Sequence, residues 1–102
     1  MPELPRAVDE FKRNQHVVWK AFTGLADCCH AAGPLDEKTR RLVKLALAIG
    51  AGLEGGTHSA VRHCLDSGIT PAEMQHVAVL GITTLGLPAS MRALTWISDH
   101  LS

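Results

Sequence analysis

The sequence predicts an all-α protein that folds as a single compact domain of about five helices. Apolar residues recur at helical spacing along most of the 102 residues, and no strand-like alternation lasts long enough to compete. Aromatic residues make up only 4% of the chain and tyrosine is absent, so Ala and Leu dominate the apolar residues. Such a composition suits closely packed helices better than strands, which favour aromatic and β-branched side chains.

The first helix is expected from about Pro5 to about Ala31. Gln15 interrupts its apolar stripe, and Gly33-Pro34 ends the helix because a permissive residue is followed by one that cannot continue it. The chain thus divides into an N-terminal amphipathic helix over 1–33 and a helical core over 34–102, within one domain. The stripe consists of Val8, Phe11, Val18, Phe22 and Leu25.

The second helix is expected to begin near Asp36, an acceptable N-cap, with Glu37 favouring the positive end of the helix. A cluster of glycines between Gly50 and Gly56 ends it. Its opening turns are basic, whereas its far end is apolar nearly all round. We therefore expect that end to be buried within the domain or against another subunit.

A third helix over about 57–67 is followed by the strongest local signal in the chain. Thr70-Pro71-Ala72-Glu73 combines a capping box with proline at the first helical position, which predicts a fourth helix from here to about Leu85. The turn Gly86-Leu87-Pro88 separates it from a fifth helix over 89–101. Because the fourth helix is apolar on more than one side, we expect a homo-oligomer.

Composition excludes several classes of function. Ten basic and ten acidic residues give zero net charge without a basic face, so nucleic acid is not an expected partner. The N-terminus carries an acid and prolines where a signal peptide is apolar, and no charge-free run is long enough to span a bilayer. These features predict a soluble cytoplasmic protein. Three cysteines, two of them adjacent (Cys28 and Cys29), argue against a disulfide framework.

From about Leu35 to Asp99 the chain resembles the carboxymuconolactone decarboxylase family, which includes the alkylhydroperoxidase D-like proteins. The resemblance rests on Leu35–Leu42, the glycine-broken helix end, Ala60–Gly68 and Thr70–Met74. It implies a small helical domain assembled into trimers or hexamers. For the peroxidase branch of the family it also implies a Cys-x-x-Cys pair, a histidine one turn later, and a glutamate one helix earlier as a proton relay.

Those reactive residues are all replaced in this chain. Alignment on Gly68 puts Leu53 and Gly56 at the two thiol positions, Ala60 at the histidine and Arg41 at the glutamate. A peroxidase of this kind attacks peroxide with one thiol and resolves the product with a second. Peroxiredoxin-type activity is therefore implied by the family but disfavoured by the residues.

The decarboxylase branch, a lyase, lacks the thiol pair and relies on polar groups in the equivalent cleft. His58 is the candidate proton donor, because the ordinary pKa of imidazole lies near neutrality. Glu54 is its expected orienting partner, and Arg41 a clamp for substrate carboxylates. Arg62 and His63 are further candidates for binding substrate. The resemblance implies decarboxylation or related acid–base chemistry on a small carboxylated or lactone substrate, with no cofactor.

Two other interpretations remain open, and with them the question whether the protein is an enzyme at all. The chain is equally compatible with a non-catalytic assembly or binding module that kept the fold and lost the site. A peroxide reductase with Cys64 as its one thiol is the third.

Individual histidines also have simpler interpretations. His58 lies on the flank of the apolar stripe of its helix and His63 nearly opposite, so a surface or capping role remains open for the first and is favoured for the second. Their five-residue spacing is a poor match to metal ligands on one helix face, and we expect no metal. His16 and His100 have no expected ligand partner nearby.

Overall fold

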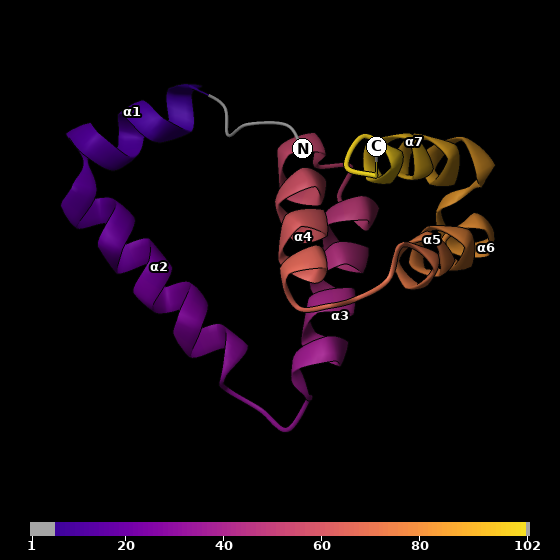
Figure 1. Cartoon of the computed structure of the whole chain (residues 1–102), viewed down its shortest axis with the longest axis horizontal. Helices are drawn as coiled ribbons and strands as arrows, with labels where there is room; N and C mark the ends of the chain where they lie inside the picture. Colours follow the sequence, from indigo (N-terminus) through magenta and orange to yellow (C-terminus); the bar gives the residue numbers. More distant parts are fainter. Residues whose placement is uncertain (1–5, 102) are drawn as a thin grey trace. The chain divides into compact units, whose positions relative to one another are not determined.

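A computed structural model describes residues 6–101 of the chain, and every regular element in that range is a helix (Figure 1). The all-α prediction is confirmed. The described residues form two compact units, 6–34 and 35–101, and each is described by itself. The first unit contains α1 (Arg6–Asn14) and α2 (His16–His30). The second contains α3 (Glu37–Gly50), α4 (Glu54–Asp66), α5 (Pro71–Leu80), α6 (Ile82–Leu85) and α7 (Leu87–Ser98).

The prediction of one long first helix is wrong, because α1 and α2 are separated at Gln15. Its φ of −129° and ψ of 49° leave the helical region, at the residue that interrupts the apolar stripe. The Trp19 ring lies 6.3 Å from the Phe11 ring and 5.8 Å from the Phe22 ring, and the Lys12 ammonium is 4.9 Å from its centroid. Neither α1 nor α2 contains a buried residue.

Helices α3 and α4 lie side by side in the second unit (Figure 1). Asp36 caps α3 as predicted, since its carboxylate accepts a hydrogen bond of 2.8 Å from the Thr39 N–H. The chain turns through Gly52, whose φ of +69° lies in the left-handed region that favours glycine. Helix α4 then begins at Glu54, three residues before the expected start. Glu54 and the glycines after it therefore belong to the first turn of α4.

The capping box that opens α5 is present as predicted. Thr70 Oγ1 accepts a hydrogen bond from the Glu73 N–H at 3.2 Å, and Glu73 Oε1 accepts one from the Thr70 N–H at 3.0 Å. The predicted fourth helix over 71–85 is wrong in one respect, because it is divided into α5 and α6 at Gly81. A Cβ there would lie 3.1 Å from both Ser90 Oγ and the Ala78 carbonyl oxygen, so α7 approaches closely only because this residue is glycine. The break at Gln15 and the division at Gly81 each add one helix to the expected five, which gives α1–α7 in the described residues.

The core of the second unit is built by α3, α4, α5 and α7. It joins the predicted stripe of α4 to apolar positions on the other helices. No helix in the described range is both long enough and apolar enough to cross a membrane. The buried apolar residues are Leu45, Ile49, Ala60, Val61, Cys64, Ile69, Met74, Ala78, Ala93 and Ile97.

Candidate functional site

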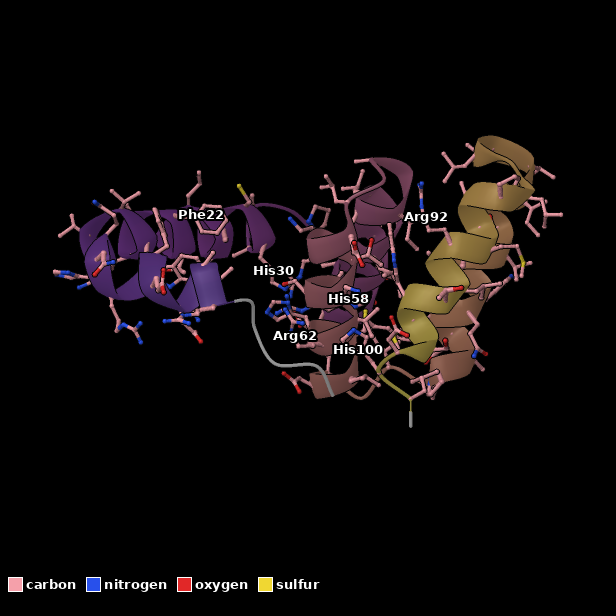
Figure 2. The ribbon with its side chains drawn as sticks, turned by 90° about the horizontal axis from the view of Figure 1, so that it is seen from above. Phe22, His30, His58, Arg62, Arg92 and His100 are labelled. Atoms are coloured by element: carbon pink, nitrogen blue, oxygen red, sulfur yellow. The ribbon has the colours of Figure 1, made fainter. Side chains whose placement is uncertain are left out.

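Two rows of side chains meet where α4 packs against α7. Glu54, His58 and Arg62 stand four residues apart on α4, and residues at this spacing share one helix face. The second row is Arg92, Trp96 and His100, on α7 and the turn that follows it. Figure 2 shows His58 and His100 between the two helices.

The central contact joins His58 and His100, with His58 Nδ1 2.7 Å from His100 Nε2. This distance is that of a hydrogen bond between the rings. His100 is 7% exposed, and the His58 side chain is 18% exposed beside the Trp96 ring, with ring centroids 6.2 Å apart. The His58 ring therefore lies sheltered between neighbouring side chains.

The other nitrogen of His58 lies toward the surface. His58 Nε2 is 3.8 Å from Glu54 Oε2, and the Glu54 side chain is 69% exposed. The imidazole thus has one nitrogen bonded inward and one beside a solvated carboxylate. The hydrogen bond at Nδ1 holds the ring in place, and Nε2 can exchange a proton on the outer side.

His100 is the residue of the pair that resists protonation. Burial lowers the pKa of His100, and the positive charges of His58 and Arg62 act in the same direction, whereas Asp99 opposes them. His100 is therefore harder to protonate than an ordinary imidazole, and the Glu54 carboxylate lies beside the other ring of the pair.

Arg92 adds a cation to the same face. Its guanidinium carbon is 5.2 Å from the centroid of the Trp96 ring, within the range of a cation–π contact. One of its terminal nitrogens would be 3.3 Å from a Cβ at Gly52, which places Arg92 against the turn that precedes α4. Neither Arg92 nor Trp96 was predicted as a site residue.

The structure does not bring Arg41 to His58. Its guanidinium pairs with Glu37 at 2.8 Å, and its carbonyl oxygen accepts a contact of 3.6 Å from the Cys64 thiol. Cys64 is six residues beyond His58, about 9 Å along α4. Arg62 lies one turn from His58, and its charge acts on His100, so it is the better placed of the two arginines. The side chain of His63 is exposed.

Cys64 is fully buried in the core. Burial raises the pKa of its thiol to about 11, although the nearby Arg41 charge opposes this shift. The group is therefore protonated at neutral pH and shielded from reagents. Cys28 and Cys29 are exposed, unpaired thiols on α2.

No group of three His, Cys, Asp or Glu side chains within residues 6–101 is arranged to hold a metal ion. A separate groove of about 590 Å³ runs between α3 and the pair α5–α6. It is lined mainly by apolar side chains, and His58 and His100 are not among its lining residues.

His100 is the residue that sequence reasoning missed. It is 42 residues from His58, so no local spacing links the two. The local signal is the four-residue spacing of Arg92, Trp96 and His100, which lie on α7 and in the turn that follows it. That spacing indicates a contact with His58 only when α7 is known to pack against α4.

The sequence model of the Carboxymuconolactone decarboxylase family matches residues 18–99 of the chain. The match covers more than half of the chain, so the chain belongs to this family. Searches of curated proteins and of solved structures returned no match.

Proposed function

We propose that the protein catalyses cofactor-free acid–base chemistry, a decarboxylation or a related reaction, on a small carboxylated or lactone substrate. The observation that carries the proposal is the placement of His58, which is bonded inward to His100 and faces Glu54 with its outer nitrogen. Membership of the decarboxylase family supports the class of reaction.

The chemistry requires one proton at carbon. Loss of carbon dioxide leaves the electron pair of the broken C–C bond on the substrate, delocalised into a neighbouring carbonyl group. His58 in its charged form then gives the Nε2 proton to the substrate carbon, so an N–H bond breaks and a C–H bond forms. The neutral ring regains a proton from water at Nε2. Glu54 pairs with Nε2–H between turnovers.

Substrate carboxylates need cations near His58. Arg62 stands one turn from His58 on α4, and Arg92 of α7 lies over the Trp96 ring, which neighbours the His58 ring. A guanidinium binds a carboxylate in a fork and also stabilises the negative charge that develops during the reaction. We therefore assign the binding role first given to Arg41 to Arg62, with Arg92 as a second cation.

The proposal is tested by turnover of a panel of lactone acids, followed by release of carbon dioxide. His58→Ala is expected to lower kcat by about 10²-fold or more, the contribution of a positioned general acid. His16→Ala, which removes an exposed histidine on α2, is the control and keeps wild-type activity. Equal turnover in wild type and His58→Ala overturns the assignment.

The second candidate function is a non-catalytic module that assembles into an oligomer. Large apolar side chains are exposed on the second unit, which fits a homo-oligomer, and the peroxidase positions of the family are replaced. We propose the homo-oligomer, a trimer or hexamer, for either function. A folded oligomer without turnover on the whole panel supports the non-catalytic module, whereas a monomer in light scattering contradicts the oligomer. The exposed residues include Leu47, Val79, Leu80, Leu87 and Met91.

A further inference from the structure

His100 uses only one side of its ring. Its Nε2 meets His58, while its Nδ1 is buried and has no hydrogen-bond partner within the described part of the chain. A neutral imidazole has one N–H and one bare nitrogen, whereas a charged one has two N–H groups. A hydrogen bond between the two rings therefore needs one nitrogen with hydrogen and one without.

The charged state of the pair allows a single arrangement. The geometry favours a positive charge on His58, because the Glu54 carboxylate lies 3.8 Å from its outer nitrogen, whereas His100 is only 7% exposed. Burial also lowers the pKa of His100. Charged His58 has hydrogen on both nitrogens and must donate from Nδ1. His100 must then accept at Nε2 and keep its own hydrogen on Nδ1. Within residues 6–101, the other charged groups that act on His100 are Arg62 and Asp99.

We propose that His100 is a positioning residue for His58, accepting its Nδ1–H so that only Nε2, on the side of Glu54, exchanges a proton with substrate. This inference rests on the proposed acid–base function of His58. It adds the residue that holds the acid in place, which the family assignment does not supply.

The geometry explains why such a residue is needed. The terminal side-chain torsion of histidine has a broad, roughly two-fold profile, so a free ring exchanges its two edges easily. The 2.7 Å contact, together with Trp96 beside the ring, fixes which edge lies outward. During turnover the Nε2 proton leaves for the substrate carbon, and the Nδ1 proton stays on His58, bonded to His100.

The experiment compares His100→Leu with His100→Gln in the full chain. The amide oxygen of glutamine accepts a hydrogen bond, whereas leucine accepts none. The first readout is nuclear magnetic resonance of ¹⁵N-labelled histidine at a pH where His58 is charged. In wild type we expect a slowly exchanging Nδ1–H proton on His58, together with hydrogen on Nδ1 and a bare Nε2 on His100. The His58 signal persists in His100→Gln and is lost by fast exchange in His100→Leu. His63→Leu, on the exposed side of α4, is the control and leaves both signals unchanged.

The second readout is kinetic. His100→Leu is expected to lower kcat about tenfold or more with little change in KM, as part of the ~10²–10⁴-fold that general acid catalysis supplies. His100→Gln recovers most of that loss. If His100→Leu fails to fold, the wild-type ring spectrum and the glutamine variant still decide the question.

The outcomes separate the two proposals. A wild-type His100 with hydrogen on Nε2 while His58 is charged, or a His58 Nδ1–H that exchanges equally fast in wild type and His100→Leu, overturns the positioning role even if the enzyme turns over. Absence of turnover with the inter-ring hydrogen bond intact overturns the proposed function and leaves the hydrogen bond established.

Discussion

His58 Nδ1 and His100 Nε2 lie 2.7 Å apart although 42 residues separate them, and this contact joins α4 to the end of α7. It joins a partly accessible imidazole to a buried one. The outer ring is next to a carboxylate, and the inner ring has a lowered pKa because it is buried. One ring of the pair is therefore partly accessible beside a carboxylate, and the other is buried.

The stability of the protein should depend on pH through His100. Burial lowers the pKa of this group below its ordinary value of 6.5, so the unfolded chain binds a proton more readily than the folded chain. The free energy of unfolding is expected to be highest above pH 6.5 and to fall as pH drops from there through the lowered pKa. Urea unfolding across pH 5–8 measures this slope. His100→Gln should make it shallower, and an equally steep slope in that variant contradicts the expectation.

Gly81 and Gly55 offer a matched pair of glycine-to-alanine changes in helical backbone. A Cβ at Gly81 would meet Ser90 Oγ and the Ala78 carbonyl oxygen at 3.1 Å, whereas a Cβ at Gly55 meets nothing within 4 Å. Gly81→Ala should therefore destabilise the protein by ~1–3 kcal/mol through overpacking. Gly55→Ala should be neutral or stabilising by up to ~1 kcal/mol through helix propensity. Urea unfolding compares the two, and the opposite order is incompatible with the close approach of α7.

The Thr70 cap gives a third test. Its hydroxyl accepts the Glu73 N–H at 3.2 Å, so Thr70→Ala removes a partner from the first turn of α5. A loss of about 1 kcal/mol in the free energy of unfolding is expected. Thr83→Ala, at an exposed position on α6, is the control and should change stability by less than about 0.5 kcal/mol. Equal effects of the two substitutions count against the cap.

The carboxylate of Glu73 links α5 to α3 through its ion pair with Lys38. The hydrogen bond to Lys38, followed by those to Thr70, lowers the pKa of Glu73 to about 2. A lowered carboxyl pKa stabilises the fold above its ordinary value of 4.5, and this stabilisation is lost as pH falls toward 2. Glu73→Gln should therefore reduce stability at pH 7 and reduce the loss on acidification. The free energy of unfolding of both proteins is measured at pH 7 and pH 3. An equal loss between these two pH values in wild type and Glu73→Gln contradicts this expectation.

Thiol reactivity distinguishes the three cysteines. Cys28 and Cys29 are exposed, whereas Cys64 is fully buried with a pKa of about 11. A thiol reagent at neutral pH should label Cys28 and Cys29 in the folded chain and reach Cys64 only after unfolding. Cys64→Ser should leave peroxide consumption at the background level of the wild type. Rapid labelling of Cys64, or peroxide consumption that depends on it, restores the one-thiol peroxide reductase.

Most of the helix boundaries can be predicted from the sequence, because the residues that begin and end a helix lie within a few positions of its ends. The caps at Asp36 and Thr70 and the left-handed glycines at Gly52 and Gly68 act within a few residues, and their signals can be read directly. The interruptions at Gln15 and Gly81 were harder to predict. A Cβ at position 81 would lie 3.1 Å from Ser90 Oγ on α7, a contact between helices that no local pattern shows.

One part of the candidate site can be predicted from local spacing along the chain. Glu54 and His58 lie one turn apart on a single helix, so their proximity follows from helical spacing. Arg41 was placed with them by alignment alone, and it pairs with Glu37 on its own helix, α3. His100 depends on the packing of α7 against α4, a long-range contact beyond the reach of periodicity.

The most direct test of the acid–base assignment is turnover of lactone acids in heavy water. Wild-type protein should release carbon dioxide and give a product with one deuterium at the carbon that lost the carboxylate, on a single face. His58→Ala should lower the rate by about 10²-fold or more. Equal rates and equal deuteration in the two proteins would show that His58 does not deliver the proton.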